Sequence, residues 1–328
     1  MGKRWLGEGN DLTLVFICQK FSTEEAARTY MEALRWPNGP VCPHCGTCDP
    51  ARISRIPANA ASKVRPGLYR CTECVNQFTV TVGTVCEDSH IPLNKWLIAF
   101  YVMCASKTQV SALQLQRQLE LGSYRSALFM CHRIRYALKE TFPTDKLDGT
   151  VKADETYMGG KARGKARGKG RGYVGNKTPV VSLVERGGRV RSQVAKMVTG
   201  DAMGKLFHKH VNASAHLNTD ESQLYTTVGK SFASHDTVTT PKRNTPGTTR
   251  IRGAGPRRTR WKASSATPSV VLAAPHHNIS AEHMDLYFAE LDFKYNTRKV
   301  TDGERTVDAI RLIKGKRLML KTPKAQGE

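Results

Sequence analysis

Apolar residues recur at helical spacing along the first half of the chain. Residues 21–35 predict an amphipathic helix that begins at Ser22 or Thr23 and ends before Pro37. Its buried side is formed by Ala27, Tyr30, Met31 and Leu34. The helical period returns from Ile91 to Leu138, where Pro92 opens one helix, residues 111–119 form a second and residues 124–138 a third.

Shorter apolar stretches after residue 145 predict strands. Residues 178–184 and 189–198 flank Arg-Gly-Gly and predict a hairpin. A strand within 151–160 delivers Asp154 just before two glycines, and residues 216–225 form a strand that ends at Asp220 and leads into a helix. This order predicts a mixed sheet whose central strands bring the two carboxylates together. A later helix, N-capped by Ser280, buries Met284, Tyr287, Phe288 and Leu291.

Nine cysteines are unevenly placed along the chain. Cys42 and Cys45 form one Cys-x2-Cys turn, and Cys71 and Cys74 form another after 25 intervening residues. Four thiolates at this spacing are typical of a structural, tetrahedral zinc ion. Two neighbours of the first turn, His44 and Cys48, are alternative ligands, although surface positions are favoured because the two pairs already satisfy zinc. We expect the isolated Cys18, Cys86, Cys104 and Cys131 to be buried thiols.

The charge of the chain indicates a polyanionic partner. The 328 residues carry a net charge of +23, which favours double-stranded DNA because phosphates attract Lys and Arg whatever the sequence. The longest apolar run, 96–105, is about half of the roughly 20 residues that a membrane-spanning helix needs. We find no secretory h-region at the N-terminus. We therefore expect a protein that acts on DNA in the cytoplasm, at the nucleoid, without a membrane partner.

The second and third helices of the 91–138 region are separated by a glycine-containing break. A short helix followed by a basic helix is typical of a helix-turn-helix, in which Arg125, Arg133 and Arg135 would contact DNA. The alternative is an ordinary helical bundle with a solvated basic face. A second basic segment, residues 161–172, predicts a flexible loop that either grips phosphates or is a solvated insertion.

Asp154 and Asp220 are the candidate catalytic residues. Asp before a turn is commonly only a cap or turn former. Two carboxylates brought together repel each other unless a divalent cation neutralises them, which predicts Mg²⁺ or Mn²⁺ as a cofactor.

Several motifs together resemble the ISXO-like insertion-sequence transposases. They are Cys-Pro-His-Cys-Gly at 42–46, Tyr-Arg-Cys-Thr-Glu-Cys at 69–74, Gln-Phe-Thr-Val-Thr-Val-Gly-Thr at 77–84, Ile-Pro-Leu-Asn-Lys-Trp at 91–96, His-Arg-Ile-Arg at 132–135, Asp-Glu-Thr-Tyr-Met-Gly-Gly at 154–160, Thr-Asp-Glu at 219–221, Ser-His-Asp-Thr-Val at 234–238 and Phe-Lys-Tyr-Asn-Thr-Arg at 293–298. The resemblance implies an N-terminal zinc ribbon, a ribonuclease H-like DDE domain with Asp154 and Asp220 as its first two acids, and two-metal phosphoryl transfer on DNA. It also implies a homo-oligomer that binds the element's ends and its target.

The chain is therefore predicted to be a multi-domain protein. We expect an N-terminal helix in residues 1–36, a small β zinc ribbon in 37–86, a helical DNA-binding module in 87–145 and an α/β ribonuclease H-like domain in 146–328. Residues 239–275 depart from the family pattern. They contain eight Lys or Arg, five Pro and no Asp or Glu, which predicts disorder and leaves no third catalytic acid.

The genetic code suggests how this departure arose. Trp is encoded only by TGG and Lys by AAA or AAG, so Trp261-Lys262 read from the third base of the Trp codon gives GAA, which encodes Glu. We hypothesise that two compensating frameshifts, near Thr239 and His276, replaced the segment that carried the third acid. The alternative is a genuine basic insertion.

Three classes of function follow from the sequence. The first is a DDE transposase that binds terminal inverted repeats and cuts and joins DNA. The second is a catalytically inactive, degenerate copy that acts only as a DNA-binding protein. The third, a zinc-ribbon transcription factor, does not account for the settings of Asp154 and Asp220.

Overall fold

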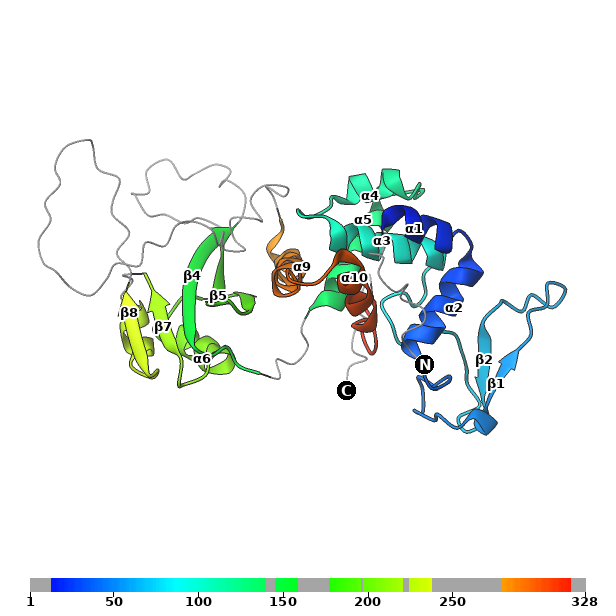
Figure 1. Ribbon diagram of the computed structural model, residues 1–328, viewed down its shortest axis with the longest axis horizontal. Coiled ribbons are helices and arrows are strands. Elements are labelled where there is room, and N and C mark those ends of the chain that lie inside the picture. The colour runs from blue at the N-terminus through cyan, green and yellow to red at the C-terminus, as the bar shows by residue number, and fades with distance from the viewer. Residues whose placement is uncertain are drawn as a thin grey trace, which may run out of the picture. The chain divides into compact units, whose positions relative to one another are not determined.

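The computed structural model describes residues 13–139, 145–158, 177–195, 197–220, 224–237 and 279–319. The chain folds as two compact units (Figure 1). The first combines the residues up to Lys139 with those from Thr297 onward, and the second comprises 140–296. The second unit is therefore inserted into the sequence of the first. Within the described ranges, every helix is too short or too polar to cross a membrane.

Five helices precede the insertion in the first unit. They are α1 (Leu14–Lys20), α2 (Glu24–Arg35), α3 (Leu93–Ala105), α4 (Ala112–Gln118) and α5 (Tyr124–Leu138). At four of the N-termini a capping hydroxyl accepts a hydrogen bond from a backbone N–H of the first turn; the capping residues are Thr13, Thr23, Ser111 and Ser123. These caps fix where each helix begins. Four of these helices, α2 to α5, match the predicted segments, with Thr23 as the cap of α2.

A three-stranded antiparallel sheet lies between α2 and α3 in the sequence. It contains β1 (Ile53–Ile56), β2 (Leu68–Cys71) and β3 (Gln77–Phe78), and a short 3₁₀ turn, η1 (Pro50–Arg52), precedes it. The rings of Trp36, Tyr69 and Phe78 pack together with centroids 5.5–5.8 Å apart. Tyr69 also donates a 3.1 Å hydrogen bond to Glu32. The aromatic cluster and this bond attach the sheet to α2. The first unit therefore contains the predicted segments 1–36 and 37–86, together with the predicted module 87–145 as far as Lys139.

The C-terminal helix α10 (Asp302–Arg311) belongs to the first unit. Our prediction that the catalytic domain extends from 146 to 328 is wrong at this end. The helix packs on α3 and buries Val307 and Ile310, while Arg305 donates a 3.1 Å bond to the Cys104 carbonyl. Farther on, Lys316 donates hydrogen bonds to the carbonyls of Ala137, in α5, and of Lys139, the residue that follows it. The sequence pattern of an isolated helix does not show which distant helix it covers.

The second unit contains a five-stranded mixed sheet. Its strands are β4 (Thr150–Met158), β5 (Thr178–Glu185), β6 (Val190–Val194), β7 (His216–Thr219) and β8 (Ser234–Thr237), in the order β6-β5-β4-β7-β8. The β4-β5-β6 pairs are antiparallel, and the β4-β7-β8 pairs are parallel. The hairpin predicted at Gly187 and the strand ending at Asp220 are confirmed. This topology is consistent with the predicted ribonuclease H-like fold.

Helices cover both faces of this sheet. On one face, α6 (Gly200–His210) and α7 (Leu224–Gly229) enclose a core that includes Val151, Leu217 and Phe207. On the other face, α9 (Met284–Asn296) packs Met284, Tyr287, Phe288 and Leu291 against Val180. All four predicted core residues of this helix are buried. A 3₁₀ turn, η2 (Ala281–His283), separates it from Ser280, whose side chain makes no capping bond, so that predicted cap is wrong.

Other expectations concern individual residues and segments. Cys86, Cys104 and Cys131 are buried as predicted, whereas Cys18 is exposed on α1. The basic segment 161–172 and the segment 239–275 lie outside the described residues.

Candidate metal centres

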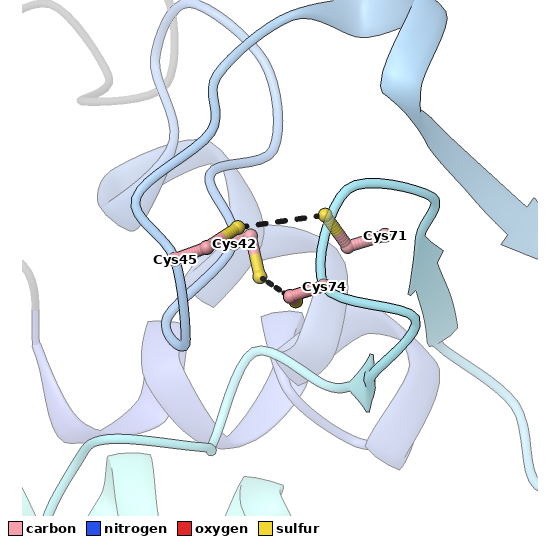
Figure 2. Close-up of side chains that lie close together, drawn as sticks. All are labelled: Cys42, Cys45, Cys71 and Cys74. Atoms are coloured by element: carbon pink, nitrogen blue, oxygen red, sulfur yellow. Dashed lines mark hydrogen bonds between the residues drawn. The ribbon is translucent and has the colours of Figure 1, made fainter.

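The four predicted zinc ligands converge at one point in the first unit. The sulfur atoms of Cys42, Cys45, Cys71 and Cys74 all lie within 4.8 Å of one another (Figure 2). The Cys42–Cys74 and Cys45–Cys71 sulfur pairs are each 3.6 Å apart. A tetrahedral zinc ion with bonds of about 2.3 Å places its sulfur ligands about 3.8 Å from each other. The donor type, number and spacing therefore fit a structural zinc ion.

The two thiols of the first turn lie in different surroundings. Burial raises the pKa of Cys42 to about 11, whereas hydrogen bonding by Thr47 lowers the pKa of Cys45 to about 6. A positive ion among the four sulfurs favours the thiolate form of each. Cys48 and His44 are exposed and do not belong to the four-sulfur group, in agreement with the surface positions we favoured for them.

Asp154 and Asp220 occupy equivalent positions on neighbouring strands of the second unit. The parallel register of β4 and β7 pairs Lys152 with Asn218. Asp154 and Asp220 each follow this pair by two residues, so the register points both side chains towards the face that α9 covers. Asp154 is half-buried and Asp220 is exposed. Two carboxylates on one face of adjacent parallel strands, one within β4 and the other just after β7, fit an oxygen-ligated divalent cation.

The backbone at Asp220 is fixed by a buried hydroxyl. Thr219 Oγ1 donates its proton to the Asp220 carbonyl, 2.9 Å away, and lies 2.8 Å from Nε2 of His235. Because the hydroxyl has one proton, Nε2 of His235 is the donor to it. A Cβ atom at Gly229 would lie 2.1 Å from Nδ1 of this ring, so the glycine leaves room for it. This arrangement orients Asp220 through its neighbour.

A second contact joins the segment after Asp220 to the strand that carries Asp154. The hydroxyl of Tyr225, on α7, donates to the carboxylate of Glu155. Desolvation, this hydrogen bond and the nearby acids Glu155, Asp220 and Asp154 all raise the pKa of Tyr225, so the phenol stays protonated. Neither Tyr225 nor His235 was predicted from the sequence. A tyrosine five residues after the acid, and a histidine in the following strand, were the available signals.

No third acid joins Asp154 and Asp220 within the part of the chain that the structure describes, where only the four cysteines form a group of three or more potential ligands. Glu290 is fully buried on α9, and its carboxylate lies 2.7 Å from the Lys294 ammonium. Glu282 is exposed in η2. Glu290 is therefore engaged in an ion pair within α9.

Two of the three arginines predicted to contact DNA are buried in the first unit. Arg133 is 8% exposed and donates to the Glu87 carbonyl, and Arg135 is 1% exposed and donates to the Val110 carbonyl. Their guanidinium groups satisfy backbone oxygens inside the unit, so the predicted role in DNA contact is wrong for both in this fold. Only Arg125, in the first turn of α5, is exposed.

Comparison with known proteins gives two family matches. Residues 22–77 match a transposase zinc-ribbon domain, and residues 146–296 match an ISXO2-like transposase domain. The chain is also similar to an uncharacterised protein in transposable element ISH50 of Halobacterium salinarum. The two are 29% identical over 223 residues, which cover 62% of this chain and 70% of that protein. No solved structure matches the chain.

Proposed function

Because the chain carries an ISXO2-like transposase domain and a transposase zinc-ribbon domain, we propose that its fold serves to bind terminal inverted repeats and to catalyse metal-dependent cleavage and strand transfer of DNA. The observation that carries this proposal is the register of β4 and β7, which brings Asp154 and Asp220 to equivalent positions on one face. No nucleophilic side chain is required, because water or a DNA 3′-hydroxyl attacks the phosphate in this type of reaction.

Asp154 and Asp220 would hold Mg²⁺ or Mn²⁺. The bound ions would supply charge stabilisation at the attacking and leaving oxygens. Thr219 fixes the backbone of Asp220, and the Tyr225–Glu155 bond joins α7 to β4. These contacts would preserve the spacing of the two carboxylates when DNA enters the site.

The first unit would bind the DNA. In this proposal α4 and α5 act as a helix-turn-helix, with Arg125 at the N-terminal end of the recognition helix, where base contacts are usual. Zinc would stabilise the ribbon without taking part in the reaction. We further propose that the protein acts as a homo-oligomer on the element's ends and target, in the cytoplasm at the nucleoid.

A second candidate function is a DNA-binding protein without catalytic activity. It is favoured by the absence of Asp and Glu from residues 239–275, together with the ion pair that occupies Glu290. A copy of this kind would still occupy the element's ends.

End-cleavage and strand-transfer assays with Mg²⁺ on terminal-repeat DNA separate the two functions. An active enzyme cuts, and Asp154→Asn abolishes cutting. An inactive copy binds without cutting, and a gene corrected in frame across 239–275 regains cleavage. Cleavage that survives Asp154→Asn would overturn the assignment of the site.

A further inference from the structure

The hairpin formed by β1, β2 and their connecting loop, residues 53–71, carries an unusual distribution of charge. Residues 50–72 contain five basic residues and no acidic one. Arg52, just before the hairpin, is paired with Glu73 at 2.9 Å. The other four cations, Arg55, Lys63, Arg65 and Arg70, are exposed and make no ion pair with any residue in the described ranges. The hairpin therefore presents charge that the fold itself does not neutralise.

The hairpin is a regular, two-stranded antiparallel ribbon. Its ladder runs from the Ile53–Cys71 pair to the Ile56–Leu68 pair, and a further bridge joins Asn59 to Val64. The Asn59 side chain accepts the backbone N–H of Ala61, which fixes the turn. Figure 1 shows the loop end extending away from α2 at the edge of the first unit. The base is anchored, because Tyr69 bonds to Glu32 on α2.

The free cations are distributed over the ribbon. Arg55 pairs with Tyr69 in the ladder and so shares its face, while Arg70 pairs with Ser54 and points to the opposite face. Lys63 and Arg65 lie in the loop. A ligand that contacts all four must surround the ribbon rather than lie flat against one side. The major groove of DNA is about 12 Å wide, accepts a two-stranded ribbon and is flanked by phosphates on both sides.

We propose that this hairpin inserts into a groove of duplex DNA and contacts the phosphate backbone through Arg55, Lys63, Arg65 and Arg70. The inference rests on the proposed function, since it names the surface by which the first unit would grip DNA. It also supplies accessible cations in place of Arg133 and Arg135, which are buried.

The test is the salt dependence of binding by the full-length, zinc-loaded protein to a random-sequence DNA duplex. Each phosphate contact contributes about 0.9 to the slope of log K against log salt. Arg55→Gln/Arg70→Gln should lower the slope by about two and weaken binding to random and terminal-repeat duplexes alike. The matched control is Lys299→Gln/Lys314→Gln, which removes the same charge from exposed positions of the C-terminal segment. It should leave the slope unchanged.

The outcomes are distinguishable. The hairpin assignment is overturned, while the proposed function stands, if the hairpin variant retains one zinc ion and shows the wild-type slope. The same conclusion follows if the control variant lowers the slope as much as the hairpin variant does. If the wild-type chain fails to bind duplex DNA at low salt, both fail. If the hairpin variant loses zinc, Lys63→Gln/Arg65→Gln in the loop provides the same measurement away from the metal, with the same expected change of about two.

Discussion

The four-cysteine centre and the proposed carboxylate site both draw their ligands from separate segments, and of the two only the cysteines form a full ligand set within the described residues. Each Cys-x2-Cys turn brings two ligands from four consecutive residues, so the first centre needs only two turns to meet. The carboxylate site needs β4, β7 and a third segment, and each contributes one side chain. A site that draws each ligand from a separate segment is lost when one segment changes, whereas a site built from local pairs survives distant changes.

The largest effect is expected from breaking the complete centre. Cys71→Ser should remove zinc and unfold the ribbon, because zinc contributes on the order of 10 kcal/mol in small zinc modules. The zinc content, measured by mass spectrometry, should fall from one ion per chain to none, and Trp36 fluorescence should change as its contacts with Tyr69 and Phe78 are lost. Cys48→Ser is the control, and a variant at this position that also lost zinc would contradict the ligand set.

The second-largest effect is expected on the free energy of unfolding, at the buried ion pair of α9. Lys294→Met should leave the Glu290 carboxylate buried without its cation and lower the free energy of unfolding by about 3–5 kcal/mol, measured by denaturant titration. Glu290→Leu/Lys294→Met removes both charges and should recover most of this loss. If Glu290 were instead a metal ligand, Glu290→Gln would weaken Mn²⁺ binding, which we do not expect.

At the proposed carboxylate site, a change of one aspartate should lower the affinity for a divalent cation. Asp154→Asn removes half of the negative charge at the pair and should weaken Mn²⁺ binding by at least about tenfold, since even changes to groups that support a ligand cost about 10–100-fold. Mn²⁺ affinity can be measured by electron paramagnetic resonance of the free ion. Asp236→Asn, on β8, is a control, because this acid pairs with His216. Equal losses in the two variants would argue against a specific pair.

The smallest effect is expected from the hydroxyl that supports Asp220. Thr219→Val keeps the size of the side chain but removes its bonds to the Asp220 carbonyl and to His235. We expect a loss of Mn²⁺ affinity of about tenfold, with Asp220 still present. The control His216→Gln alters another histidine of the same sheet, one that contacts Ser234 and Asp236 instead. An unchanged affinity in Thr219→Val would show that Asp220 needs no support.

Sequence patterns predicted the local features well. The two cysteine turns, the cap at Thr23 and the β5–β6 hairpin are set by a few consecutive residues, and the structure confirms them. The roles of Asp154 and Asp220 followed from strand order, and these roles stay a prediction.

Features that depend on long-range packing were missed. α10 packs on α3 because the apolar faces of these two helices fit together. The amphipathic pattern of α10 alone does not identify its partner, since the other helices show similar patterns. Arg133 and Arg135 look like surface cations in the sequence, but they are buried and donate hydrogen bonds to the distant backbone carbonyls of Glu87 and Val110. Charge alone does not distinguish a buried arginine from one that meets phosphate.

The return of the chain to the first unit affects the order of synthesis. The ribosome makes α1 to α5, then the whole inserted unit, and only then α10 and Lys316, which complete the first unit. The first unit can therefore complete its packing only after the C-terminal residues have been synthesised. If a frameshift near Thr239 ended translation early, the product would lack α10 as well as the third acid. In our hypothesis, a second shift that restores the frame before α9 would preserve α10 and with it the packing of the first unit.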